Sequence, residues 1–376
     1  MPRKTPTPFD ALLEEPVNSL AEQAMDEGRI AIGYTCSYVP SVLLSVPPLF
    51  PLRLRAPGAA GTELADIYMS NLTCSYTRSL LEFAMDYRYQ ALGGFVHTAG
   101  CDHMRRLHDN LTYLMPPSFS HILDIPHRTG EEGLAWYRQD IKALAEKLES
   151  HFGVSMSSDA LKAAIADHNL LIKKIQAVSD LRKAEQPVIS GAEFHCLLMA
   201  AVTSPAHLIG PRIDTFFDHL AQRPPIEDAR ARLMIVGGQM DNPRFIETIE
   251  SAGALVVADR TCTGSLFGAA PIDETEADPL DAIARHGLFS PGCPRMMEDF
   301  DRRLSRILEA AKAFRVDGII VEFIKFCDTW GVEAASLVPA LRDAGFRVLS
   351  LEREYAATGM GQLQTRIQAF LESMGK

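Results

Sequence analysis

The sequence predicts an α/β protein with two parallel-sheet domains and an added helical segment. Short apolar runs rich in β-branched residues alternate with longer segments of helical period, which is the pattern of parallel strands connected by helices. This alternation occurs early in the chain and again near its end, so two α/β units are expected. The length of 376 residues and the hydrophobic content of 47% allow each unit a core of its own.

Each unit contains four candidate strands. The expected strands are residues 29–35, 52–55, 94–98 and 122–126 in the first unit, and residues 232–236, 254–258, 318–323 and 348–351 in the second. Strands that alternate with helices in this way indicate a Rossmann-like or flavodoxin-like sheet in each unit.

The chain between the two units is almost free of strand signals and rich in Ala, Leu, Lys and Glu, so we expect it to be helical. The dipeptide Pro224-Pro225 marks its end. We therefore expect an N-terminal helix plus a first α/β domain at 1–130, a helical linking region at 131–225 and a second α/β domain at 226–376. Two later helices are predicted from apolar residues that share one face: Phe300, Leu304, Ile307, Leu308 and Ala311, then Leu363, Ile367, Phe370 and Leu371.

Charge and segment composition exclude several classes of protein. The 37 Lys and Arg residues against 48 Asp and Glu residues give a net charge of −11, which argues against a nucleic-acid partner. The first twenty residues lack the apolar segment of a secretory signal, and repeated prolines interrupt the uncharged stretch 30–52 that could otherwise span a membrane. We expect a cytoplasmic protein whose seven cysteines are thiols, metal ligands or nucleophiles rather than disulfides.

The positions of the cysteines carry the main functional signal. Four of them come at or just after the end of a predicted strand, the edge at which open parallel sheets bind ligands: Cys36, Cys101, Cys262 and Cys327. Two more precede a predicted helix, Cys74 before Ser75 and Cys293 before Pro294, where backbone amides stabilise a thiolate. The seventh, Cys196, lies in an apolar helical segment, so we expect it to pack in the core and not to bind metal.

Three kinds of chemistry could use such thiols. Zinc knuckles and CxxC redox sites need closely spaced cysteine pairs, and this sequence has none. A nucleophilic Cys101 with His97 or His103 as its base would leave five placed cysteines unexplained. Thiolates from separate loops are compatible with an iron–sulfur cluster. The residues alone leave a cluster and ordinary reduced thiols both open.

Six motifs, in their order and separation, give the sequence a resemblance to the 2-hydroxyacyl-CoA dehydratase and benzoyl-CoA reductase family. They are YTCSYVP at 34–40, GCD at 100–102 leading into MRRL at 104–107, CTGS at 262–265, CPRM at 293–296, KFCD at 325–328 and GQLQTR at 361–366. The resemblance runs over nearly the whole chain from about residue 28. It implies two α/β domains with added helices and a cluster held by three cysteines, which correspond to Cys74, Cys101 and Cys327 here. With three protein thiolates, one iron keeps a position for substrate.

The remaining three cysteines make the chain most similar to the double-cubane cluster proteins of that family. In those proteins two Fe4S4 cubanes share a bridging sulfide, which implies a second ligand set of Cys36, Cys262 and Cys293 and an [8Fe-9S] cluster. The alternative is the [4Fe-4S] subunit of a 2-hydroxyacyl-CoA dehydratase or benzoyl-CoA reductase. After Pro40 the sequence continues with Ser41-Val42-Leu43-Leu44 in place of the family's acidic residues. This departure leaves open whether the substrate is an acyl-CoA or another small molecule.

The resemblance also implies partners. Family members receive low-potential electrons from a separate ATP-hydrolysing activator that carries its own iron–sulfur cluster. This chain has no G-x-x-x-x-G-K-[ST] loop, which agrees with ATP being bound elsewhere. Double-cubane relatives are homodimers, whereas the dehydratases and reductases pair related but different subunits, so both assemblies stay open. A non-catalytic two-domain protein that binds a small ligand is the remaining alternative.

Several charged residues beside the cysteines could serve a reaction, but each also has an ordinary structural role. The candidate proton donors are Asp102, Asp328, His97 and His103, and each could instead cap a helix or lie in solvent. Glu322 and Lys325 precede Cys327 and are expected to form an ion pair. Arg105 and Arg106 could meet a CoA phosphate or form a solvated helix face.

Overall fold

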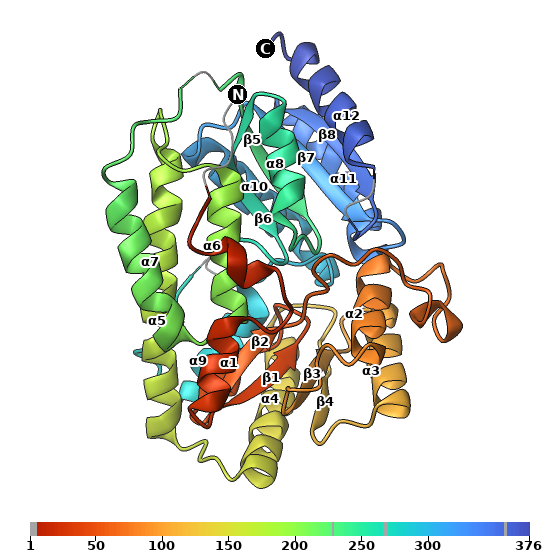
Figure 1. Cartoon of the computed structure of the whole chain (residues 1–376), viewed down its shortest axis with the longest axis vertical. Helices are drawn as coiled ribbons and strands as arrows, with labels where there is room; N and C mark the ends of the chain where they lie inside the picture. The colour runs from red at the N-terminus through yellow and green to blue at the C-terminus, as the bar shows by residue number, and fades with distance from the viewer. Residues whose placement is uncertain (1–5, 228, 266–269, 357–358) are drawn as a thin grey trace.

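The computed structural model contains two four-stranded sheets in which every strand pair is parallel. It describes residues 6–227, 229–265, 270–356 and 359–376. The strand orders are β2-β1-β3-β4 and β6-β5-β7-β8, and Figure 1 shows the two sheets at opposite ends of the molecule. The predicted α/β class with two parallel sheets is confirmed.

The first sheet consists of short strands that are buried along most of their length. They are β1 (Ile30–Tyr34), β2 (Leu49–Arg53), β3 (Gly94–Thr98) and β4 (Ser120–Leu123). The predicted limits of the second and fourth strands, 52–55 and 122–126, are wrong by two or three residues. Pro51 lies inside β2, which is possible because β2 is an edge strand and needs no ladder donor on its open side.

The second sheet matches the predicted strands closely. It consists of β5 (Ala231–Gly237), β6 (Ala254–Thr261), β7 (Gly318–Ile324) and β8 (Arg347–Arg353). The two central strands, β5 and β7, are mostly apolar and buried along nearly their whole length because helices cover each side of the sheet.

The helices occupy the segments between strands and the predicted linking region. In the first unit they are α1 (Ser19–Asp26), α2 (Ser75–Met85) and α3 (Asp102–Leu114). The linking region is helical as predicted, with α4 (Glu131–Phe152), α5 (Ser158–Asp180), α6 (Gly191–Thr203) and α7 (Ala206–Leu220). The remaining helices are α8 (Pro243–Ser251), α9 (Pro279–Phe289), α10 (Phe300–Ala313), α11 (Asp328–Asp343) and α12 (Met360–Ser373).

Helix α6 is the central element between the two sheets. Every one of its residues is buried, and it contacts β2 of the first sheet and β6 of the second. Its start is fixed by Ser190 and Glu193, whose side chains each accept a hydrogen bond from the other's backbone amide. Cys196 lies in this helix with no exposed surface, so its predicted place in the core is confirmed.

Packing crosses the domain limits expected from the sequence. The segment from Ile272 to Met296 contributes to a core shared with β1, α4 and α5. This part of the predicted second domain therefore packs against the first sheet and the linking helices. The division into 1–130, 131–225 and 226–376 stays a prediction. In the part of the chain that the structure describes, no helix has both the length and the apolar character needed to cross a bilayer.

Candidate metal centre

The carboxyl ends of the two sheets face each other and are joined by hydrogen bonds. The Ser37 hydroxyl, which follows β1, donates to the carbonyl of Cys262 after β6 at 2.7 Å. The backbone amide of Tyr355, which follows β8, donates to the Ser75 hydroxyl at the start of α2 at 2.8 Å. Loops from both sheets therefore meet at the edge where parallel sheets bind ligands.

Four cysteines lie on these loops, as the sequence predicts. Cys36 and Cys262 follow β1 and β6, while Cys101 and Cys327 follow β3 and β7 and are the N-cap residues of α3 and α11. Cys74 is the N-cap residue of α2, which also agrees with the prediction.

The predicted helix start at Cys293 is wrong. The backbone amide of Met296 bonds to the carbonyl of Cys293, so residues 293–296 form a turn, and α10 begins only at Phe300 after a short 3-10 helix. Proline favours the second position of a turn as much as the first turn of a helix, which explains the error at Pro294. The turn still supplies an amide, because the backbone N–H of Arg295 donates to Cys293 Sγ at 3.5 Å.

Cys74, Cys101 and Cys327 form one group of interacting thiols, called here the first triplet. Burial raises the pKa of Cys101 to about 12, with further contributions from Cys74 and Cys327. Burial likewise raises the pKa of Cys327 to about 12, and Cys74 adds to the effect. The three residues also lie in or against the same hydrophobic cluster, which places their side chains in one region of the molecule.

Cys36, Cys262 and Cys293 form a second group, called here the second triplet. A hydrogen bond with the Cys293 side chain lowers the pKa of Cys262, and the same bond, followed by burial, raises the pKa of Cys293. Burial raises the pKa of Cys36, to which the nearby Cys262 contributes. Cys262 and Cys293 therefore form a hydrogen-bonded pair, and Cys36 lies within electrostatic reach of it.

The two triplets are neighbours. Cys36 of the second triplet contributes electrostatically to the raised pKa of Cys101 in the first triplet, and Cys262 contributes in the same way to that of Cys327. In the described ranges, no three His, Cys, Asp or Glu side chains are close enough together for a single metal ion. A four-iron cube places its thiolates on separate iron atoms, so its ligands stand farther apart than those of one ion. Thiols on separate loops are a donor set that an iron–sulfur cluster can use.

Helix N-termini give the first triplet a positive environment. Cys74, Cys101 and Cys327 are N-cap residues of α2, α3 and α11, and none of the three helices has a side-chain capping bond. The free amides and the helix dipole at each start favour a negative sulfur. Nearby hydroxyls add to this, since the sulfur atoms of Cys74 and Cys327 lie 3.5 Å from the hydroxyls of Thr77 and Thr329.

His103 links two elements of the first triplet. Its Nδ1 accepts a hydrogen bond from the backbone amide of Cys74 at 3.2 Å, so the proton of a neutral ring lies on Nε2. That Nε2 is 4.0 Å from the carboxylate of Asp328, the first residue of α11. His103 thus connects the Cys74 loop to the Cys327 helix.

The other charged residues noted in the sequence have different places. His97 is buried on β3, and burial lowers its pKa to about 3, which makes it a poor proton donor. Glu322 pairs with Arg353 at 2.7 Å and not with Lys325, so the expected ion pair of Glu322 and Lys325 is wrong. Alternate residues of a strand point to opposite sides, and Lys325 lies just beyond the end of β7, three residues after Glu322.

The remaining candidates lie on helix surfaces. Arg106 pairs with Asp109 on the exposed side of α3. Asp102 is the first residue of α3, where it complements the helix dipole without making a capping bond.

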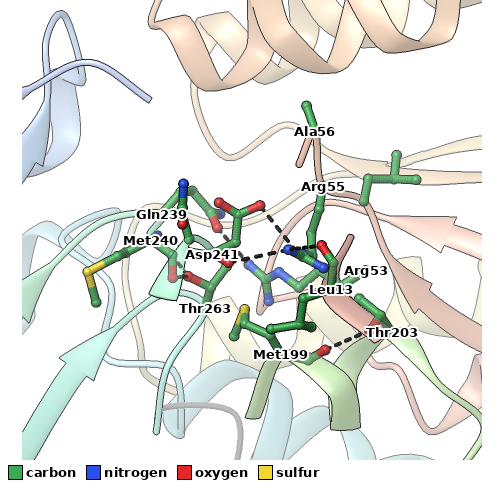
Figure 2. Close-up of polar contacts among 12 residues, drawn as sticks. Leu13, Arg53, Arg55, Ala56, Met199, Thr203, Gln239, Met240, Asp241 and Thr263 are labelled. Atoms are coloured by element: carbon green, nitrogen blue, oxygen red, sulfur yellow. Dashed lines mark hydrogen bonds and ion pairs between the residues drawn. The ribbon is translucent and has the colours of Figure 1, made fainter. Parts of the chain in front are cut away.

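Sequence reasoning missed two buried residues that support the second triplet or the loops that carry it. The indole N–H of Trp330 donates to Cys262 Sγ at 3.4 Å. Arg53 lies at the end of β2 and crosses to Gln239 after β5, as Figure 2 shows. The only signal for Arg53 in the sequence is a charged residue at the end of an otherwise apolar strand, which is rarely buried without a functional or structural reason.

Two adjoining cavities lie among the loops at the ends of β2, β5 and β8, and none of the described cysteines lines either of them. One of about 250 Å³ lies between the end of β8 and α12 and is lined in part by Lys325, two residues before Cys327. The other, of about 860 Å³, lies between the loops after β2 and β5. Asp241 and Tyr355 line both cavities, so the two are adjacent.

The chain is similar to known proteins over nearly its whole length. Residues 36–374 match the family described as 2-hydroxyglutaryl-CoA dehydratase, D-component. The chain is 25% identical over 350 residues to a benzoyl-CoA reductase subunit of Thauera aromatica, covering 90% of this chain and 88% of that protein. It is 22% identical over 369 residues to the (R)-phenyllactyl-CoA dehydratase beta subunit of Clostridium sporogenes, covering 97% of both chains.

A third relative is the beta subunit of (R)-2-hydroxyglutaryl-CoA dehydratase of Acidaminococcus fermentans, 20% identical over 377 aligned positions that cover 97% of this chain and 98% of that protein. The matched segment contains all six cysteines of the two triplets. The chain belongs to the 2-hydroxyglutaryl-CoA dehydratase D-component family of enzymes.

Proposed function

We propose that this protein is the iron–sulfur reductase component of a two-component system and holds a double-cubane [8Fe-9S] cluster. The observation that supports this most is the grouping of six cysteines into two neighbouring triplets where the two sheets meet. Three thiolates for each of two cubanes is the number that the family resemblance requires. The first triplet would hold one cubane and the second triplet the other.

The residues around the thiols fit such a group. None of the six cysteines of the two triplets is in a disulfide, and the pKa of every one except Cys262 is raised, with burial among the causes, so these five thiols are costly to ionise without a nearby cation. Bound iron would supply that charge, so assembly would release the thiol protons. When bound, the cluster would accept low-potential electrons and offer an iron position to the substrate.

The chain's own groups would position and stabilise the thiolates. The starts of α2, α3 and α11 and the amide of Arg295 point positive dipoles at sulfur. The Trp330 indole N–H donates a hydrogen bond to Cys262 Sγ, and His103 accepts one from the backbone amide of Cys74. The two cavities that Tyr355 lines would admit substrate, and Lys325, two residues before Cys327, lines one of them.

A second candidate is the [4Fe-4S] subunit of a 2-hydroxyacyl-CoA dehydratase or benzoyl-CoA reductase. The names of the relatives support it, because they are subunits of a phenyllactyl-CoA dehydratase and a benzoyl-CoA reductase. Only Cys74, Cys101 and Cys327 would then bind iron. Against it stands the segment after Pro40, where Val42, Leu43 and Leu44 are buried in the core and offer no polar group to a substrate.

The proposed partners follow from the chemistry. Electrons at very low potential would come from a docked activator that hydrolyses ATP and carries its own cluster, and we expect both proteins in the cytoplasm. The double-cubane proposal predicts a homodimer, and the single-cubane alternative predicts a heterodimer with a related subunit. The family match supports an enzyme, so we do not propose the non-catalytic ligand-binding alternative.

Iron and sulfide analysis of protein purified without oxygen tests the proposal. A double cubane gives about eight irons per chain, one cubane gives about four, and a protein without a cluster gives none. Cys101→Ser and Cys262→Ser should each remove one of two EPR-active cubanes, whereas Cys196→Ser is the matched control. Cys196 is a buried cysteine outside both triplets, so its replacement should leave the iron content unchanged. Loss of iron in the Cys196 variant alone would contradict the assignment.

A further inference from the structure

Arg53 is a buried cation that no carboxylate balances. Its side chain is 1% exposed and donates to the Ser37 hydroxyl at 3.0 Å, to the Thr35 carbonyl at 3.2 Å and to Gln239 Oε1 at 3.2 Å. All three acceptors are neutral. The ionisable groups that interact with it electrostatically are Tyr34, Tyr76, Cys36 and Cys262. Among the described residues, no carboxylate lies within ion-pair distance of it.

Arg55, two residues further along the chain, is also buried, but its positive charge is balanced by a carboxylate. Its Nε lies 3.4 Å from Oδ2 of Asp241, and both side chains are buried. Figure 2 shows Arg53 and Arg55 reaching from the end of β2 toward the loop that carries Gln239 and Asp241. Both arginines therefore join the two sheets, but only Arg55 meets an anion there.

A guanidinium stays protonated in a protein, and a buried charge without an opposite charge is unfavourable by several kcal/mol. Arg53 is therefore expected to face an anion in the functional protein. The ionisable groups beside it that can supply one are Cys36 and Cys262 of the second triplet, which both interact with it electrostatically. Tyr34, whose ring centre is 5.6 Å from the guanidinium, and Tyr76 also interact with Arg53, but burial raises the pKa of both phenols, so they remain neutral.

The hydrogen bonds of Arg53 go to residues that flank or contact the same two cysteines. The Thr35 carbonyl and the Ser37 hydroxyl that it binds lie on either side of Cys36. Ser37 in turn donates to the carbonyl of Cys262. One side chain thus fixes the loops that carry two of the three thiols in the second triplet.

We propose that Arg53 is a positioning residue for the second triplet, whose fixed positive charge balances the thiolates of Cys36 and Cys262 and makes a cluster held there easier to reduce. The inference rests on the proposed function, because it requires that the second triplet bind iron. Positive charge close to a cluster favours its reduced form, so it raises the midpoint potential.

The test compares three variants of the full chain purified without oxygen. Arg53→Gln removes the charge, Arg53→Lys keeps the charge but loses the planar fork, and Arg55→Lys is the matched control at the balanced position. The measurements are iron per chain, midpoint potential from EPR-monitored titration and the rate of iron loss to a chelator. Each variant is also made with Cys101→Ser, which leaves the second triplet as the remaining cluster site.

Arg53→Gln should make the midpoint potential of the second-triplet cubane more negative and leave the first unchanged. Arg53→Lys should keep the potential near that of the wild type but lose iron about tenfold faster, because its loops are held less firmly. Arg55→Lys should change neither potential. If Arg53→Gln does not fold, the tenfold faster iron loss of Arg53→Lys decides the matter, and an unchanged rate overturns the inference.

The failures of the inference and of the proposed function are distinct. An iron-loaded Arg53→Gln variant with unchanged potentials overturns the role of Arg53 and leaves the proposed function intact. A wild-type protein with about four irons overturns the inference and favours the single-cubane alternative. A wild-type protein without iron overturns both.

Discussion

The indole Nε1 of Trp330 lies 3.4 Å from Cys262 Sγ and donates a hydrogen bond to it. The two residues are 68 positions apart, and the contact joins α11 to the loop after β6. Trp330 is also packed in the core between the second sheet and α11, so its ring orientation is fixed. The same side chain therefore supports the helix that follows Cys327 and a sulfur of the second triplet.

Trp330→Phe should raise the pKa of Cys262 in the metal-free protein. The hydrogen bond with Cys293 is the main cause that lowers this pKa, burial opposes it, and the Trp330 bond lowers it further. Phenylalanine keeps most of the packing but lacks the donor. The pH midpoint for alkylation of Cys262, measured by mass spectrometry, should move upward. The chain's other tryptophan, the exposed Trp136, is the control, and an equal shift in Trp136→Phe would contradict this role.

His103→Ala should weaken iron binding at the first triplet. The substitution removes the acceptor for the Cys74 backbone amide and the link from α3 to Asp328. Groups that orient ligands in this way typically contribute about tenfold or more to metal affinity, so iron loss to a chelator should be about tenfold faster. His219, exposed near the end of α7, is the matched control, and its replacement by alanine should not change the rate. Equal rates of iron loss for the His103 and His219 variants would show that His103 does not support iron binding at the first triplet.

Glu322→Gln should destabilise the fold, whereas Lys325→Gln should not. Glu322 has no exposed surface, and its carboxylate accepts a 2.7 Å hydrogen bond from Arg353, which also donates to the carbonyl of Gln239. Loss of this charge-assisted bond should lower the free energy of unfolding by about 2 kcal/mol. Lys325 makes no such pair, and its replacement should change stability by less than about 0.5 kcal/mol. Denaturation in guanidinium chloride measures both, and similar losses would contradict the pairing.

The strands were predictable because their apolar runs have clear ends, and β3 matches its predicted limits residue for residue. The fourth motif was harder, because proline at 294 suits a helix start and a turn equally well, and the backbone amide of Met296 selects the turn. A contact from far along the chain also holds this turn, because the Arg295 guanidinium donates to the carbonyl of Ile125, 170 positions away, and local sequence does not show such a partner.

The site was predictable in its cysteines but not in their surroundings. Cys101 and Cys327 each follow a strand that the sequence shows plainly, and sheet topology then brings the two sheet edges together. The contacts of Arg53 with Gln239 and of Trp330 with Cys262 span 186 and 68 positions. Nothing in the local pattern of an arginine or a tryptophan indicates a partner that far along the chain.

Glu250 should make the stability of the protein depend on pH. Burial raises the pKa of this carboxyl from 4.5 to about 7, although backbone amides of Gly191, Ala192 and Val256 donate to it. The folded state therefore binds a proton more tightly than the unfolded state. Its contribution to stability is fully present below about pH 4.5 and is lost as the pH rises through about 7.

Glu250→Gln removes this proton linkage, so the difference in unfolding free energy between wild type and variant should change between pH 5 and pH 8. The expected slope is up to about 1.4 kcal/mol per pH unit, with the wild type losing stability relative to the variant as the pH rises. Urea denaturation at pH 5, 6, 7 and 8 measures it. Glu146→Gln, on the exposed side of α4, is the control and should show a flat difference. A flat difference for Glu250→Gln as well would mean that this carboxyl stays ionised in the folded protein, held by its three backbone amides.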